Sequence, residues 1–178
     1  MENIKAIIQF LLSPTARYSV LALLLVGLVA GIGSVVAFNV TMAATSTEAF
    51  CTDSCHEMTD NPGYMLEGTT HFMNKSGVRP TCADCHVPKE FIPKMIRKIE
   101  ASREVWGSIT GMIDTPEKYA AHAPRMKARE IARLKANDSQ ECRNCHEVDK
   151  MLLSMQTAKA QEYHQRAEQQ GKTCIDCH

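Results

Sequence analysis

The sequence has no excess of charge of either sign, because 20 basic residues balance 20 acidic ones among 178 residues. Without a basic surplus there is little to neutralise phosphates, so nucleic-acid binding is not expected. Glycine and proline occur only 9 and 7 times, which excludes a collagen-like or low-complexity chain. The length suits one domain of ordinary size.

Apolar core material is scarce over residues 48–178. Leucine, isoleucine, valine and phenylalanine together account for 18 of these 131 residues, about 14%. With so few apolar residues, burial of side chains alone does not offset the conformational entropy that this segment loses on folding. We therefore expect a group other than side chains to fill its interior.

One long apolar run contrasts with this lean segment. Residues 18–47 carry no charge, and the stretch 20–38 is almost wholly apolar, long enough for a helix to cross a hydrocarbon layer of about 30 Å. We predict a membrane-spanning helix over 18–40 rather than a cleaved signal peptide or a buried core helix. Its glycines would permit close approach of a second such helix and leave a homo-oligomer open: Gly27, Gly31 and Gly33.

The charges that flank this run predict its orientation. Lys5 and Arg17 precede it and Glu48 follows it, and positive residues stay on the cytoplasmic side. The predicted organisation is a cytoplasmic N-terminus over 1–17 and a periplasmic domain over 41–178. The expected location is therefore the inner membrane of a bacterium, with the lipid bilayer crossed once.

Eight cysteines form four close pairs, and a histidine follows each pair directly. Tandem Cys-x-x-Cys-His is the attachment signal for c-type haem, in which two thiols bond the haem and the histidine ligates its iron. Zinc sites or disulfides would not require a histidine after every pair. We predict four covalently attached haem c groups, which would also fill the lean interior. The cysteines are Cys51, Cys55, Cys82, Cys85, Cys142, Cys145, Cys174 and Cys177, and the motif histidines are His56, His86, His146 and His178.

The four motifs are not identical. CADCH, CRNCH and CIDCH have two residues between the cysteines, whereas the first, CTDSCH, has three, which predicts an irregular first site. A six-coordinate haem needs a second axial ligand, and three histidines outside the motifs are the candidates: His71, His122 and His164. One of four irons then needs another arrangement. Met58, two residues after His56, is a candidate by spacing, although a lone methionine ordinarily packs in a core.

The expected fold class is mainly α, a single N-terminal transmembrane helix followed by a loop-rich helical tetrahaem cytochrome c domain. After a loop-rich stretch over 48–90, apolar spacing predicts a helix over 92–113. Capping signals predict a second helix over 115–137, interrupted at Pro124, and a third runs from 148 to 171. The first of these helices has a basic side, which we interpret either as a solvated face or as a contact for anionic lipid or substrate. Its residues are Lys94, Arg97, Lys98 and Arg103.

Longer phrases between residues 50 and 178 carry a resemblance. They read FCTDSCHEM, SGVRPTCADCHVP, KMIRKIEAS, IDTPEKY, NDSQECRNCH and TCIDCH. Together with one N-terminal anchor and four haem motifs, they resemble the NapC/NirT/NrfH family of membrane-bound tetrahaem quinol dehydrogenases. The phrases are most similar to the NapC branch, which serves periplasmic nitrate reductase.

The resemblance implies a function and a quinol site. It implies oxidation of menaquinol or ubiquinol and electron transfer to a periplasmic terminal reductase, for nitrate or for nitrite. It further implies Met58 as a ligand of the first haem. In the stretch KIEASREVWG it implies Glu104 as the proton acceptor and Lys98 as the group that orients the quinol oxygen. A non-enzymatic, membrane-tethered relay or storage cytochrome is the alternative.

Two departures from the family pattern bear on these expectations. The extra residue in the first motif affects the geometry of the haem expected on the quinol side. Relatives usually continue beyond the position of His178 with a short tail that carries another distal histidine. Either the sequence is cut short or one haem lacks that ligand, with His122 as a substitute.

Overall fold

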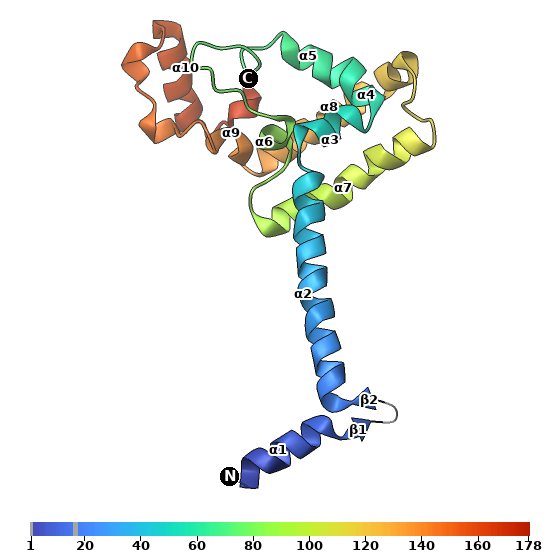
Figure 1. Ribbon diagram of the computed structural model, residues 1–178. Coiled ribbons are helices and arrows are strands. Elements are labelled where there is room, and N and C mark those ends of the chain that lie inside the picture. The colour runs from blue at the N-terminus through green and yellow to red at the C-terminus, as the bar shows by residue number, and fades with distance from the viewer. Residues whose placement is uncertain (1, 16–17) are drawn as a thin grey trace. The chain divides into compact units, whose positions relative to one another are not determined.

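The computed structural model describes residues 2–15 and 18–178 (Figure 1). The chain divides into two units, residues 1–45 and residues 46–178. Helices dominate both, and the described strands are a single pair of two residues each. The predicted mainly α fold class is confirmed.

The N-terminal unit contains α1 (Glu2–Leu12) and a long helix, α2 (Val20–Ala44), with the strands β1 (Pro14–Thr15) and β2 (Tyr18–Ser19) paired antiparallel between them. The side chain of Ser19 accepts a hydrogen bond from the Ala22 backbone N–H at 3.2 Å and so caps α2. Helix α2 has 25 residues, is exposed throughout most of its length, and is long and apolar enough to cross a membrane. The predicted N-terminal apolar helix is confirmed, and it ends at Ala44 rather than at residue 40.

The second unit begins with short helical pieces. They are α3 (Glu48–Asp53), α4 (His56–Met58), the π-helical turn η1 (Thr59–Gly63), α5 (Tyr64–Glu67) and α6 (Cys82–His86). An irregular stretch over 68–81 connects α5 to α6. The first two haem motifs lie on α3–α4 and on α6, so short local helices present them rather than one long element.

Two long helices follow, α7 (Phe91–Ile109) and α8 (Pro116–Ala136). The predicted cap is present, since the Thr115 hydroxyl accepts a hydrogen bond from the Lys118 N–H at 3.4 Å and Pro116 occupies the first turn. The predicted interruption at Pro124 is wrong, because α8 continues through it. Pro124 is exposed, and its ring removes one backbone hydrogen bond from α8. Beyond it, Arg129 and Arg133 anchor the C-terminal half of the helix through ion pairs with Glu104 and Glu141.

The C-terminal part is less regular than the sequence predicted. It contains α9 (Gln140–Arg143), two single 3₁₀ turns η2 (Val148–Lys150) and η3 (Leu153–Met155), α10 (Ala158–Gln169) and η4 (Cys174–Asp176). The predicted helix over 148–171 therefore begins only at Ala158, where the Thr157 hydroxyl accepts from the Ala160 N–H at 3.3 Å. Gly171, with φ +61°, follows its end.

The interior of the second unit is as poor in apolar side chains as its composition predicts. Of the described residues, the large apolar side chains that are buried are Ile113 and Leu134. Three polar residues are buried as well, namely Glu57, Ser139 and Glu141. Side-chain packing alone is thus a small part of what holds this unit together.

Candidate haem-binding and quinol-binding sites

The second and fourth motifs share one local structure. In the second, the carboxylate of Asp84 accepts hydrogen bonds from the Thr81 N–H at 2.8 Å and from its hydroxyl at 2.7 Å. In the fourth, Asp176 accepts the same pair from Thr173, at 2.9 and 3.0 Å. These capping boxes fix the turn that carries each Cys-x-Asp-Cys-His. The sequence signal, Thr-x-x-Asp, is present in both motifs, although neither capping box was predicted.

The first motif has a different backbone path, as its extra residue predicted. Helix α3 ends at Asp53, Cys55 is extended with φ −136° and ψ 111°, and a new helix begins at His56. The π-helical turn η1 follows directly, and π-helical turns frequently occur at functional sites. Met58 closes α4 and is half-buried.

The motifs lie beside one another in the order of the sequence. Helix α6 contacts both α3 and α9, and η4 contacts α8 (Figure 1). Burial raises the pKa of Cys82, and the nearby Cys51 of the first motif raises it further. Likewise, burial and then Cys142 of the third motif raise the pKa of Cys85. Cys174 of the fourth motif adds to the effect of burial on Cys142.

The third and fourth motifs are also joined by direct hydrogen bonds. Ser139, fully buried between α8 and α9, accepts a hydrogen bond from the Ile175 N–H at 3.2 Å. Lys135 of α8 forms an ion pair with Asp176 at 2.6 Å. All eight cysteines, which lie within the described residues, are free of disulfide bonds. Their thiols therefore remain available for bonds to a prosthetic group.

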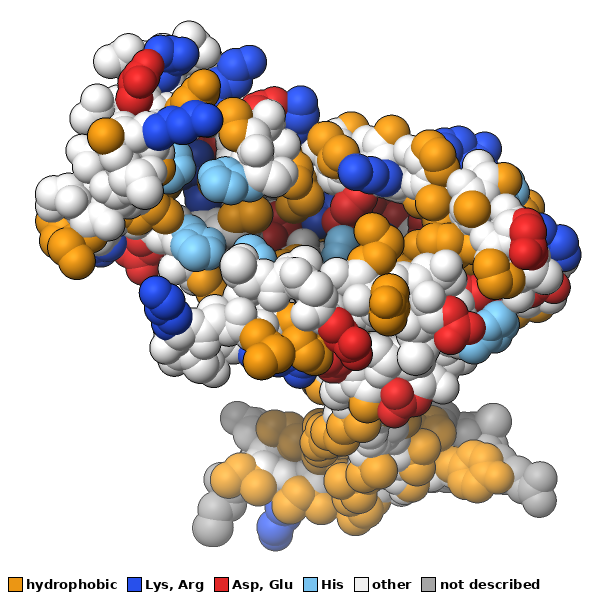
Figure 2. All heavy atoms as spheres, turned by 90° about the horizontal axis from the view of Figure 1, so that it is seen from above, with side chains coloured by type: hydrophobic (Ala, Val, Ile, Leu, Met, Phe, Trp, Pro, Cys, Tyr) orange, Lys and Arg blue, Asp and Glu red, His pale blue; other side chains and the backbone are white. Residues whose placement is uncertain are grey.

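Two histidines from outside the motifs face motif histidines. The ring centroids of His71 and His146 are 6.2 Å apart, and those of His164 and His178 are 6.0 Å apart. Figure 2 shows histidine side chains gathered around a hollow of this unit. Two imidazoles on opposite sides of one metal ion, each with a bond of about 2 Å, would have ring centres about 6 Å apart. Both separations fit an iron between the rings.

The hydrogen bonds of two histidines fix which ring nitrogen is free. His86 Nδ1 lies 2.8 Å from the Glu130 carboxylate, and His164 Nδ1 lies 2.7 Å from the side-chain oxygen of Gln156. Both partners are acceptors, so each Nδ1 carries the proton and donates. The unprotonated Nε2 of each ring is then available to a metal.

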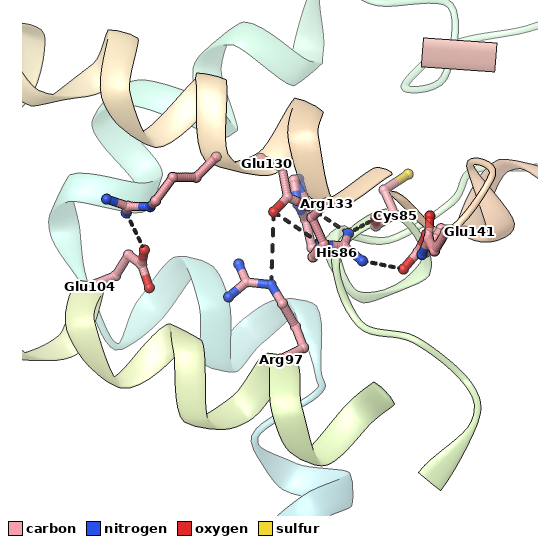
Figure 3. A network of polar contacts seen from close by, with 9 residues as sticks. Cys85, His86, Arg97, Glu104, Glu130, Arg133 and Glu141 are labelled. Carbon is pink, nitrogen blue, oxygen red and sulfur yellow. Dashed lines mark hydrogen bonds and ion pairs between the residues drawn. The ribbon is translucent and has the colours of Figure 1, made fainter. Parts of the chain in front are cut away.

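Glu130 belongs to a charged network that joins the second and third motifs (Figure 3). Arg133 of α8 contacts Glu130 at 2.7 Å, donates to the Cys85 carbonyl at 3.4 Å, and binds the buried Glu141, next to Cys142. Burial disfavours the charged form of Glu130, but hydrogen bonds from His86 and Arg133 outweigh it and lower its pKa to about 2. The carboxylate that faces His86 is therefore ionised.

A cavity of about 530 Å³ lies between α7 and α8. Its apolar lining includes Trp106 and Ile113, and its polar lining includes Glu104 and His122. This size and mixture are typical of small-molecule sites. Glu104 Oε1 accepts a hydrogen bond from Arg129 at 2.9 Å, whereas its Oε2 is buried and has no hydrogen-bond partner.

The two residues predicted for a quinol site lie on different faces of α7. Lys98 is beside Cys51: burial raises the pKa of that thiol and Lys98 opposes the increase, while burial lowers the pKa of Lys98 itself. Glu104 instead faces α8 and the cavity. His122 lines this same cavity, so the structure brings it together with Glu104.

A buried carboxylate beside the first motif was not predicted from the sequence. Glu57 directly follows His56, and its Oε1 accepts a hydrogen bond from Ser108 of α7 at 2.8 Å. Its Oε2 is buried without a hydrogen-bond partner. Ser108 lies one turn beyond Glu104, so this contact brings the Glu104 side of α7 toward the first motif. The sequence held no signal for this burial, since Glu57 stands in a polar, loop-like stretch.

Four ordered Cys-x-x-Cys-His-type motifs with facing histidines on a mainly α scaffold define a multihaem cytochrome of the c type. Residues 13–178 match the N-terminal region of the NapC/NirT cytochrome c family. The chain belongs to the NapC/NirT cytochrome c family. No solved structure matches it.

Individual relatives cover most of the chain. The chain is 48% identical to "Denitrification system component NirT" of Stutzerimonas stutzeri, over 97% of this chain and 85% of that protein. It is also 48% identical to "Cytochrome c-type protein NapC" of Escherichia coli K12, over 92% of this chain and 81% of that protein. A "Putative tetraheme cytochrome-c type" protein of Allochromatium vinosum is 45% identical over 93% of this chain and 89% of its own length.

The residues of this chain fit the haem c that a cytochrome c family implies. The thiols are free, and two histidine pairs are spaced for a metal between them. The scarcity of buried apolar side chains leaves room for large apolar groups. The apolar helix α2 and the family together indicate an inner-membrane protein.

Proposed function

We propose that this protein is a membrane-anchored tetrahaem cytochrome c that oxidises a membrane quinol and delivers the electrons to a periplasmic reductase. The observation that carries the proposal is the order of the motifs, each of which lies beside the next from the first to the fourth. Haem c at these motifs supplies one-electron redox chemistry, which the surrounding protein tunes through ligands, hydrogen bonds and exposure.

The proposed axial ligands follow from the histidine geometry. His71 would complete the site of the third motif opposite His146, and His164 the site of the fourth opposite His178. His86 is held by Glu130 so that its Nε2 is free. Met58 is the proposed second ligand at the first motif, on the short helix that begins with His56.

The cavity between α7 and α8 is the proposed quinol site. A quinol loses two protons with its two electrons, so the site needs a proton acceptor. Oε2 of Glu104 is the proposed acceptor, because it is buried, has no hydrogen-bond partner, and belongs to a carboxylate that Arg129 holds through Oε1. His122 is a second polar group on the cavity wall, and we assign it to this site rather than to an iron.

Lys98 has a role outside the proposed quinol site. It lies beside Cys51 and opposes the rise in the pKa of that thiol that burial causes. Contact between Ser108 and Glu57 holds α7 against the same motif. We propose that Lys98 supplies a positive charge at the edge of this motif, on a different face of α7 from the cavity in which Glu104 takes up the proton.

The proposed orientation and partners follow from charge and from the names of relatives. Positive residues precede α2, so residues 1–17 are assigned to the cytoplasm and the second unit to the periplasm. A relative named for a denitrification system and relatives named NapC support a reductase of nitrate or nitrite respiration as the electron acceptor. Menaquinol or ubiquinol is the proposed donor.

The test is the rate at which a soluble quinol reduces the purified, haem-loaded protein in a stopped-flow experiment. We expect Glu104→Gln to slow this reduction by at least about tenfold, since general-base assistance typically contributes about 10²–10⁴ in rate. Glu162→Gln is the matched control, because Glu162 is an exposed carboxylate that also pairs with an arginine, Arg166. Dithionite should reduce every haem in all three proteins.

Two outcomes would contradict the proposal in different ways. A wild-type rate for Glu104→Gln would show that the proton acceptor lies elsewhere. If dithionite reduces the wild-type protein but quinols do not, the protein is instead a membrane-tethered relay or storage cytochrome.

A further inference from the structure

Helix α7 is amphipathic in the opposite sense from an ordinary surface helix. The side chains that it directs at the rest of the unit are polar: Arg97 lies 3.9 Å from Glu130, Glu104 pairs with Arg129, and Ser108 donates to Glu57. Figure 3 shows Arg97 and Glu104 on the side of α7 that faces α8. Positions 97, 104 and 108 share one face of a helix with 3.6 residues per turn.

The opposite face of α7 is apolar and exposed. At about 100° per residue, Ile99 and Trp106 lie nearly half a turn from Arg97. They are 68% and 64% exposed, and Ile109 is 73% exposed. Further exposed apolar side chains extend this outer face toward the start of the helix: Phe91, Ile92 and Ile96. An exposed apolar face of this kind marks a protein or membrane contact.

We propose that α7 is an interfacial helix whose outer face, Ile92, Ile96, Ile99, Trp106 and Ile109, inserts into the surface of the phospholipid bilayer. The proposal rests on the membrane anchorage described above and adds a second, peripheral membrane contact. An amphipathic helix in this position lies in the plane of the interface, with its apolar side in the acyl region and its polar side outward. Here the polar side binds the protein's own second unit.

Charge complementarity favours a lipid surface over other occupants. Lys98 borders the outer face beside Ile109, and Lys94 lies one turn before Lys98. Arg103 projects from the outer face itself, at an angle between those of Ile99 and Ile96. Basic side chains at the edge of an interfacial helix extend to anionic headgroups while their stems cover the apolar boundary. Trp106, the only tryptophan in the chain, lines the cavity between α7 and α8 and is still 64% exposed to the outside. Tryptophan is enriched at the membrane interface.

The covalent chain keeps α7 within reach of the bilayer. Six residues separate Ala44, the last residue of α2, from Cys51, which is a span of at most about 25 Å. Lys98 of α7 interacts with Cys51. The outer face of α7 is thus tethered by a short segment to a helix that is long and apolar enough to cross the membrane.

Photo-crosslinking of the full-length, haem-loaded protein tests this proposal. The photoreactive residue p-benzoylphenylalanine replaces Ile99 or Trp106, one at a time, in vesicles of phosphatidylethanolamine and phosphatidylglycerol. Val29 in α2 is the positive control for membrane insertion, and Met155, 82% exposed on η3, is the matched exposed apolar control. Each variant must keep the haem absorbance of the wild type. Mass spectrometry then identifies what each probe has bound.

We expect lipid adducts at positions 29, 99 and 106, with yields at 99 and 106 at least about ten times the yield at 155. Lipid adducts at 29 but not at 99 and 106 would overturn the interfacial helix and leave the anchor intact. The absence of adducts at all three would overturn the anchor as well. Crosslinks from 99 and 106 to haem or to another protein, or equal lipid labelling at 155, would also overturn the proposal.

Discussion

His86 and His164 donate hydrogen bonds from Nδ1 to acceptors of different charge. The acceptor of His86 is the Glu130 carboxylate at 2.8 Å, and that of His164 is the neutral amide oxygen of Gln156 at 2.7 Å. An anionic acceptor makes an imidazole a stronger donor to a metal, which stabilises the oxidised form of the metal. The two hydrogen bonds are nearly equal in length, but their acceptors differ in charge, so we expect them to affect the reduction potential of a bound haem differently.

This difference predicts opposite effects for two conservative substitutions. Glu130→Gln should raise the reduction potential of the haem at the second motif by roughly 30–60 mV, up to about a tenfold change in a one-electron equilibrium. Gln156→Glu should lower the potential of the haem at the fourth motif by a similar amount. Spectroelectrochemical titration of the purified variants measures both. Titration curves identical to wild type in both variants would show that these hydrogen bonds do not tune the haems.

Arg133 is the residue on which the polar interior depends most. It bridges Glu130 and the side chain of Glu141, which is only 1% exposed. Hydrogen bonds from Arg133 and Asn137 outweigh the effect of burial and hold the pKa of Glu141 below its ordinary value. Arg133 is therefore the ion partner that keeps the buried Glu141 in its charged form.

Arg133→Met should destabilise the haem-loaded protein by about 3–5 kcal/mol, because it leaves a buried carboxylate without its ion partner. Lys150→Met is the control, since Lys150 and its partner Glu147 are both largely exposed and such pairs contribute little. Urea unfolding followed by haem absorbance gives both values. Equal stability of the two variants would contradict the assigned role of Arg133.

At the scale of elements, α10 is a short helix that carries His164, and its stability depends strongly on its N-terminal cap. It begins at the Thr157 cap and presents His164 toward His178. Its 12 residues are marginal for a helix without tertiary support, so the cap contributes a large part of its local stability.

Thr157→Ala should therefore loosen α10 by about 1 kcal/mol, which corresponds to roughly fivefold faster amide exchange within it. Thr157→Ser keeps the capping oxygen and should exchange as the wild type does. Hydrogen–deuterium exchange with mass spectrometry resolves residues 158–169 from the rest. Unchanged exchange in the alanine variant would mean that packing alone holds the helix.

The sequence predicted the elements that local chemistry determines. Thr115 and Pro116 gave the start of α8, and the apolar run gave α2. The start of α10 was missed because residues 148–156 have helical composition but form two separate 3₁₀ turns, η2 and η3. Continuity through Pro124 was not predicted because proline inside a helix ordinarily ends or kinks it, whereas α8 continues with Pro124 in its interior.

The four motifs could be predicted from the sequence, but which histidine outside the motifs faces which motif histidine could not. The spacing of cysteine and histidine is local chemistry, so all four motifs could be recognised from the sequence. The partner of each spare histidine depends on contacts between segments far apart in the chain, such as His71 with His146. The same reason explains why Glu104 and Lys98, six residues apart, were expected at one site although helical geometry directs them to different faces.

At the scale of the whole molecule, the second unit is organised around its motifs rather than around a side-chain core. Ile113 and Leu134 are the large apolar side chains that are buried among its residues, while polar bonds such as Ile175 to Ser139 and Arg133 to Cys85 connect consecutive motifs. A row of haems in the order of the sequence would supply both the missing core and a path for electrons from the first motif to the fourth.

The most direct test of this central claim is the anomalous diffraction of iron in crystals of the haem-loaded protein. We predict four iron peaks whose order in space follows the order of the motifs. One peak should lie between His71 and His146 and another between His164 and His178. Three or fewer peaks, a different order, or irons that lie away from both histidine pairs would contradict the account.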